Sequence, residues 1–101
     1  MEYSFTITDN AKFELVQLQD ENKNNKFRIF VTYSNSDGFQ YSFTFDDEIN
    51  DDDLIFNCQI QEKKLAVLID TISIQYLNGA TLDFIQKTKT FVITNPNATK
   101  E

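Results

Sequence analysis

The sequence contains no histidine and no tryptophan, and its single cysteine is Cys58. Without histidine the commonest general base of enzymes is missing, and no serine or cysteine has an identifiable group beside it that would activate it as a nucleophile. One cysteine also cannot form an intramolecular disulfide, which is typical of proteins in a reducing compartment. We therefore expect a protein that is not an enzyme and that is located in the cytoplasm.

Basic residues are scarce as well, because nine lysines and arginines stand against sixteen acidic residues and the formal charge is −7. A surface of this sign repels the phosphates of nucleic acids and of anionic lipids. No apolar stretch reaches the roughly 18 residues that cross a bilayer, and the N-terminus has neither the basic start nor the apolar segment of a signal peptide. We expect no nucleic-acid partner and no membrane partner.

Proline and glycine are rare, with one and two residues, whereas phenylalanine and tyrosine are abundant, with ten and four. This composition argues against a disordered chain, and aromatic and β-branched residues favour strands. The length of 101 residues is that of one domain. We therefore expect residues 1–101 to form a single domain.

Strict alternation of apolar and polar residues predicts strands that pack on one face. Phe27, Ile29, Val31 and Tyr33 share one face of the first long strand, whereas Arg28 lies on the opposite, polar face. The run from residue 65 to residue 69 is almost continuously apolar, as in a strand that is covered on both faces. The predicted strands are residues 4–8, 27–34, 39–46, 54–61, 65–69, 80–86 and 91–94.

One helix is predicted near the N-terminus, where Ala11, Leu15 and Leu18 recur at helical spacing. Either Thr8 or Asp9 can cap it, because a side-chain oxygen accepts the free N–H groups of the first turn. The helix is expected to end at residues 20–22, before a polar turn at residues 23–26.

A second, short helix is predicted over residues 71–78, with Ile74 and Leu77 facing inward and Gly79 as its stop signal. Together the elements predict a mainly β protein with some α+β character. It has one helix near the start of the chain and a short one before Gly79.

Three segments occur in a fixed order: TITDNAKFELVQL, then SDGFQYSFTFDDE, then LIDTISIQYLNGATLDFI followed by FVITNPNA. Together they resemble the A-type iron–sulfur carrier family, also called HesB/IscA-like, over nearly the whole chain. The resemblance implies a HesB-like β-sandwich and a place among the proteins of iron–sulfur cluster assembly.

The resemblance also implies three cysteine ligands, one in a Gly-Cys-Ser/Ala-Gly loop between two strands and two in a Cys-Gly-Cys tail after Asn-Pro-Asn. Aligned on Gly38, the loop cysteine falls on Ser36 and the preceding glycine falls on Asn35. Aligned on the Asn-Pro-Asn of residues 95–97, the first tail cysteine falls just past Glu101. The iron of a cluster prefers thiolates, and a serine hydroxyl titrates far too high to replace one. We expect Ser36 to be a turn residue and no cofactor to be bound.

Two other features have a metal-binding and a structural interpretation. Cys58 would be a relocated ligand or redox sensor in the first, and a core residue on a face with Leu54, Phe56 and Ile60 in the second, which we favour. The acidic segment from Asp46 to Asp53 could bind a hard cation such as Ca²⁺. It lacks the spacing and the glycine of an EF-hand, and runs of charge are usually solvated linkers.

These observations leave three functions open. The first, which we favour, is a degenerate A-type protein that has lost its cluster ligands and binds a protein partner, for example of the iron–sulfur assembly machinery. The second is an iron–sulfur cluster or iron carrier with unconventional ligands, or with ligands shared with a partner. The third is an interaction domain unrelated to iron–sulfur assembly. In each case we expect a monomer or a weak homodimer.

Overall fold

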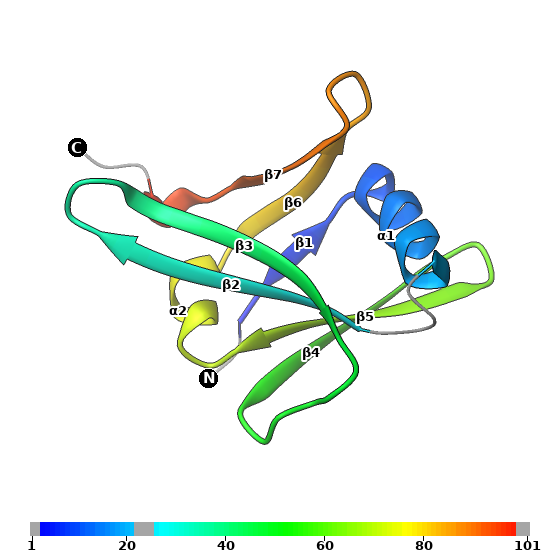
Figure 1. Ribbon diagram of the computed structural model, residues 1–101, viewed down its shortest axis with the longest axis horizontal. Helices are drawn as coiled ribbons and strands as arrows, with labels where there is room; N and C mark the ends of the chain where they lie inside the picture. Colours follow the sequence, from blue (N-terminus) through cyan, green and yellow to red (C-terminus); the bar gives the residue numbers. More distant parts are fainter. Residues whose placement is uncertain (1–2, 22–25, 99–101) are drawn as a thin grey trace.

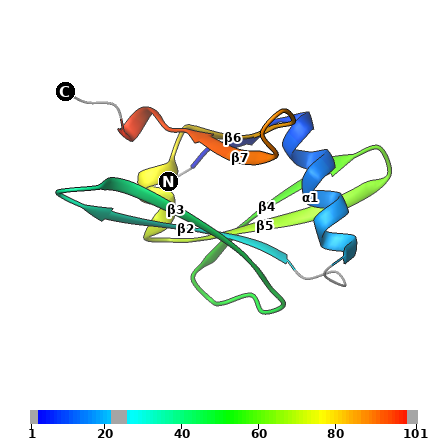
Figure 2. The ribbon, with the colours of Figure 1, turned by 45° about the horizontal axis from the view of Figure 1, so that its top comes forward.

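The computed structural model describes residues 3–21 and 26–98. These residues form two sheets that face each other as the layers of a sandwich (Figures 1 and 2), which confirms the expected mainly β fold. The first sheet has the strand order β1-β6-β7 and the second has the order β3-β2-β5-β4. The strands are β1 (Phe5–Ile7), β2 (Lys26–Ser34), β3 (Gly38–Asp46), β4 (Asp53–Ile60), β5 (Lys63–Asp70), β6 (Ala80–Ile85) and β7 (Thr90–Thr94).

The core lies between the two sheets and is filled by every second residue of each strand. Ile29, Val67, Ile69 and Leu82 are fully buried there. Phenylalanine rings join the layers: the Phe84 and Phe91 centroids are 4.9 Å apart, and rings from β2 and β3 pack beside Phe91. The alternation in the sequence thus predicts correctly which face of each strand is inside.

Helix α1 (Asp9–Glu21) is capped by Thr8, whose Oγ1 accepts the Ala11 N–H at 3.2 Å and donates to Asp83 Oδ1 at 2.6 Å. The cap therefore also ties the start of the helix to β6. Ala11, Leu15 and Val16 are buried, whereas Leu18 is only half-buried. The polar turn predicted after the helix lies mostly at residues 22–25, outside the described residues.

Helix α2 (Ser73–Leu77) is shorter than predicted and follows a turn that the Asp70 side chain holds. Asp70 Oδ1 accepts the Ser73 N–H at 2.8 Å, and Ser73 Oγ accepts the Val31 N–H at 3.1 Å. Ile74 and Leu77 are fully buried, as predicted. Neither helix in the described part of the chain is long and apolar enough to span a bilayer.

Arg28 is the largest departure from the sequence-based prediction. It lies on the outer face of the second sheet, yet only 2% of its surface is exposed. The strand order explains this burial: β3 and β4 are at opposite edges of the sheet, so the connection between them crosses the outer face over β2 and β5. Leu68, the register partner of Arg28 on β5, is also fully buried.

The acidic segment surrounds the Arg28 guanidinium. Asp53 accepts two hydrogen bonds from it, at 2.5 and 2.7 Å, and Asp46 accepts one at 3.1 Å. The backbone carbonyl of Glu48 accepts a fourth at 3.1 Å. The Asp53 side chain is completely buried, and the hydrogen bonds from Arg28 lower the pKa of its carboxyl despite the opposing effect of burial. Residues 47–52 are exposed, as is usual for a charged linker, but Asp46 and Asp53 at the two ends of the segment are bound to Arg28.

Removing Asp53 should be costly, because Arg28 would remain buried with only the partly exposed Asp46 as a charged partner. We expect Asp53→Ala to lower the free energy of unfolding by about 3 kcal/mol, measured by urea denaturation. Asp52→Ala removes the same charge from an exposed neighbour and should change it by no more than about 0.5 kcal/mol. Equal effects of the two substitutions would show that the buried pair is not a stabilising unit.

The Arg28–Asp53 pair also determines how the stability difference between the wild-type protein and Asp53→Ala depends on pH. Because the folded pKa of Asp53 is lowered, its stabilisation is complete above the unfolded value of about 3.9 and is lost as the pH falls through the folded value. The difference between the wild-type protein and Asp53→Ala should therefore shrink on acidification below about pH 4.

Candidate functional site

The turn that carries Ser36 joins β2 to β3. Ser34 pairs with Gly38, and the three residues between them are exposed. The Asp37 N–H donates to Ser34 Oγ at 3.0 Å, and Gly38 has a φ of 73°, in the left-handed region. Within the described residues the Ser36 hydroxyl has no hydrogen-bond partner. Its surroundings are those of a turn residue, with no group nearby that would activate the hydroxyl.

The Asn-Pro-Asn segment is fixed to α2 by the amide groups of its two asparagines. Asn95 Nδ2 donates to the Tyr76 carbonyl at 2.8 Å and to the Tyr41 hydroxyl at 3.1 Å. Asn97 Nδ2 donates to the carbonyls of Tyr76 and Asn78, both at 2.9 Å. A short 3₁₀ turn, η1 (Pro96–Ala98), follows from this arrangement.

The turn that carries Ser36 and the Asn-Pro-Asn segment lie at the same end of the molecule. Figures 1 and 2 show the β2–β3 turn, α2 and the C-terminal end of β7 on the same side of the molecule, away from α1. The fold thus brings together the two segments on which the sequence alignment was based; the assignment of the loop-cysteine position to Ser36 stays a prediction. The donors that this end offers are hydroxyl, amide and carboxylate groups of residues 35–37 and 95–97. This oxygen-rich set does not fit an iron–sulfur cluster, whose iron prefers thiolates.

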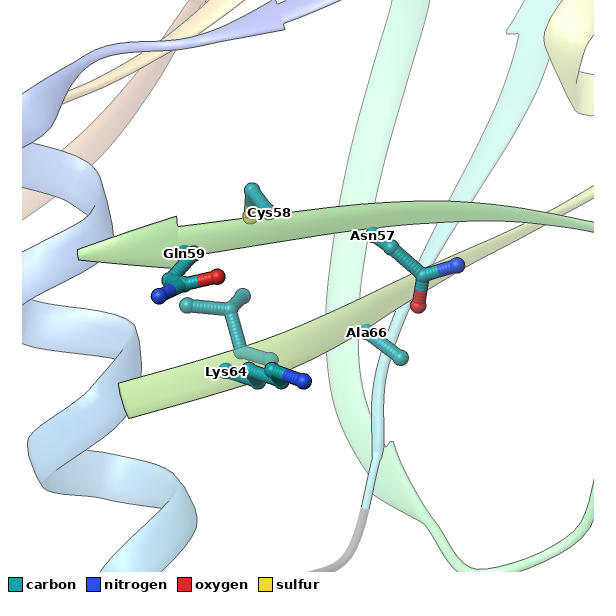
Figure 3. Close-up of a pocket in the computed structure, with 6 residues that line it drawn as sticks. Asn57, Cys58, Gln59, Lys64 and Ala66 are labelled. Atoms are coloured by element: carbon teal, nitrogen blue, oxygen red, sulfur yellow. The ribbon is translucent and has the colours of Figure 1, made fainter. Parts of the chain in front are cut away.

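Cys58 is far from this end in the sheet, because β4 and β3 are at opposite edges. Its side chain extends from one face of the β4–β5 hairpin, whereas Asn57, Gln59 and Lys64 extend from the other (Figure 3). The thiol packs against the core as predicted, but it is half-buried. Burial raises the pKa of the Cys58 thiol, and the positive charge of Lys12 only partly offsets this. The thiolate that a metal or an oxidant needs is therefore disfavoured.

A group of aromatic and aliphatic side chains lies at the end that carries Ser36, and it was not predicted from the sequence. The Tyr33 and Phe39 ring centroids are 5.3 Å apart, and Phe39 and Tyr76 are 5.4 Å apart. Tyr33 is 58% exposed, and Ile72, one helical turn before Tyr76, is 66% exposed. Alternation places Tyr33 on the core face correctly, but the core does not extend as far as this end of β2.

The sequence matches the family model for iron-sulphur cluster biosynthesis over residues 3–101. A protein of Azoarcus sp. (strain BH72) whose name describes iron–sulfur cluster insertion, ErpA, is 46% identical over 97 residues. The matched region covers 92% of this chain and 80% of that protein. The chain therefore belongs to the iron–sulfur cluster biosynthesis family, which confirms the resemblance found in the sequence.

Solved structures share the fold. The crystal structure of Escherichia coli SufA, involved in the biosynthesis of iron–sulfur clusters, matches with a TM-score of 0.81 at 21% identity, covering 100% of this chain and 89% of that one. A crystal structure of IscA with a [2Fe–2S] cluster matches with a TM-score of 0.71 at 23% identity, covering 92% and 86%. At these identities the likeness establishes the architecture alone.

Gly38 and Ser36 should respond differently to substitution. A Cβ on Gly38 would meet no atom within 4 Å, so any penalty arises from its positive φ. We expect Gly38→Val to lower the free energy of unfolding by at least about 1 kcal/mol, Gly38→Asn to cost less, and Ser36→Ala to change it by no more than about 0.5 kcal/mol. Chemical denaturation measures all three, and a silent Gly38→Val would contradict the assigned turn.

Cys58 should react slowly with a thiol reagent in native buffer and rapidly in denaturant, because it is half-buried and its pKa is raised. Cys58→Ala should cost on the order of 1 kcal/mol through a small cavity. A matched control places the only thiol on the exposed face of the same strand, as Asn57→Cys in the Cys58→Ala background. This thiol should react rapidly in both conditions, and equal native rates would contradict the assigned faces.

Proposed function

We propose that this chain is a non-catalytic member of the iron–sulfur cluster biosynthesis family that acts by binding a protein partner. It does not carry a cluster on its own loop ligand. The observation that carries the proposal is Ser36, an exposed turn residue without a polar partner among the described side chains. It stands where the family resemblance places the loop cysteine. The chain therefore offers no thiolate ligand at the loop position where the family resemblance places one.

The intact scaffold supports a role that depends on surface shape. The Thr8–Asp83 bond, the Asp70–Ser73 bond and the Asn95–Tyr76 bond fix the starts of both helices and the Asn-Pro-Asn segment without involving Ser36. A chain that keeps these contacts keeps the shape of the surface around them, which a protein partner could bind. The names of its relatives direct the proposal to partners that assemble, deliver or receive iron–sulfur clusters. We place this activity in the cytoplasm, with the protein as a monomer or a weak homodimer.

One observation favours a second candidate, a carrier that shares ligands with a partner. The turn that carries Ser36 and the Asn-Pro-Asn segment lie at one end of the molecule, as Figures 1 and 2 show. Thiolates from a partner bound there could hold a cluster against this chain. The soft donors would then come from the partner, because this end of the chain offers oxygen and amide groups.

Anaerobic reconstitution with iron and sulfide tests the proposal. We expect the wild-type chain and Ser36→Ala to remain colourless, because neither offers a thiolate in the loop. Ser36→Cys with Asn35→Gly, and with a Cys-Gly-Cys tail joined after Glu101, should gain weak, labile visible absorption. The negative charge of Asp37 beside the turn disfavours an anionic cluster and limits the gain.

Stoichiometric iron and sulfide on the wild-type chain alone would contradict the proposal and support a carrier. The same result only after mixing with a cysteine-bearing family relative would support shared ligands. A redesigned chain that folds and takes up no iron would show that the scaffold itself has diverged.

A further inference from the structure

Tyr33, Ile72 and Tyr76 are exposed, and with the half-buried Phe39 ring, which packs against both tyrosine rings, they form the surface that we call the hairpin-end patch. The ring contacts join three of them. Ile72, the N-cap residue of α2, is four residues before Tyr76, the spacing that places two helical residues on the same face. The exposed fractions are 58% for Tyr33, 66% for Ile72 and 37% for Tyr76. Contiguous exposed apolar groups of this kind mark interaction sites, and tyrosine is enriched in protein interfaces.

The charges around the patch are of one sign. From residue 27 to residue 62 the only cation in the sequence is Arg28, and residues 65–86 contain none. Arg28 is buried and engaged by Asp46 and Asp53. Asp37 lies in the turn next to the Tyr33–Phe39 pair, is exposed, and forms no salt bridge with another described residue. The patch therefore offers aromatic faces and a carboxylate without an ion-pair partner among the described residues. Lys26, the other cation of β2, lies at the opposite end of that strand, in register with Asp46.

We propose that the hairpin-end patch binds an arginine presented by a protein partner. A guanidinium can stack on the Tyr33 or Tyr76 ring and pair with the Asp37 carboxylate, while neighbouring apolar side chains of the partner cover Ile72 and Phe39. The proposal deepens the partner-binding role above and rests on it. Arginine suits the site better than lysine, because its planar group is more weakly hydrated and stacks on rings.

A second copy of this chain does not fit the patch. Arg28 is the only arginine in the sequence, and it is buried. Two copies would also bring their Asp37 carboxylates toward each other in molecules that already carry a net charge of −7. The occupant must therefore be a different protein.

A peptide probe tests this assignment on the intact chain. The probe is a capped heptapeptide of alternating leucine and arginine, compared with the same peptide carrying lysine or glutamate in place of arginine. Backbone amide shifts in NMR titrations locate the binding and give the dissociation constant. We expect shifts in β2, the β2–β3 turn and α2, about threefold weaker binding of the lysine peptide, and none of the glutamate peptide.

Variants separate the patch from general attraction to an acidic protein. Tyr33→Ala and Asp37→Asn should each weaken the arginine peptide about two- to fivefold, whereas Tyr33→Phe, which keeps the ring, should bind as the wild type does. Phe13→Ala removes an aromatic residue of similar exposure, 46%, from α1. Asp52→Asn removes one exposed charge outside the patch. Both controls should leave binding unchanged.

Several results would overturn the assignment: no binding of the arginine peptide, equal binding of the lysine peptide, equal losses in the controls, or shifts centred on another face. Concentration-dependent shifts at the patch without peptide would assign it to self-association instead. Reconstitution distinguishes this failure from that of the proposed function. A protein that stays colourless but does not bind the peptide contradicts only the assignment of the patch. A protein that takes up a cluster and also binds the peptide contradicts only the proposed function.

Discussion

The pairing of Arg28 with Asp53 is the interaction on which the arrangement of the second sheet depends. A buried guanidinium is strongly destabilising unless a carboxylate and further acceptors surround it. Those acceptors come from the two ends of the β3–β4 connection and from a carbonyl within it. The connection has to cross β2 and β5 to reach the far edge of the sheet. Arg28 binds this connection where it crosses the sheet. The connection supplies the acceptors for the buried guanidinium, and the guanidinium fixes the path of the connection.

This interaction also shows where sequence reasoning ends. Alternation assigns Arg28 to the face opposite Phe27 and Ile29 correctly, and an acidic run after β3 is visible in the sequence. Neither observation shows that the run crosses over the arginine, because period two gives the face of a residue and says nothing about what covers that face. Cys58 is the converse case. Its face was predicted correctly, but its half-burial follows from the position of β4 at a sheet edge, which only the strand order reveals.

The sequence indicated which two segments to compare. It could not show the contacts that bring them together or the groups that surround them. The Asn-Pro-Asn segment and the turn at Ser36 were both located from the resemblance, and the fold brings them to one end. The contacts that achieve this come from asparagine amides and from backbone carbonyls of α2. None of them involves position 36. The residue at position 36 can therefore differ without altering the contacts that fix this end of the fold.

Arg28 already makes, inside the protein, the kind of contact that we propose for an arginine at the hairpin-end patch. Arg28 Cζ lies 5.9 Å from the centroid of the Phe30 ring while its nitrogens bind carboxylates, so one guanidinium uses an aromatic face and acidic groups together. The hairpin-end patch presents the same two kinds of group to solvent, with Tyr33 and Tyr76 as the rings and Asp37 as the carboxylate. Inside the fold a residue of the chain completes the arrangement. At the surface the only arginine of the chain is already used, so the complementary group has to come from another protein.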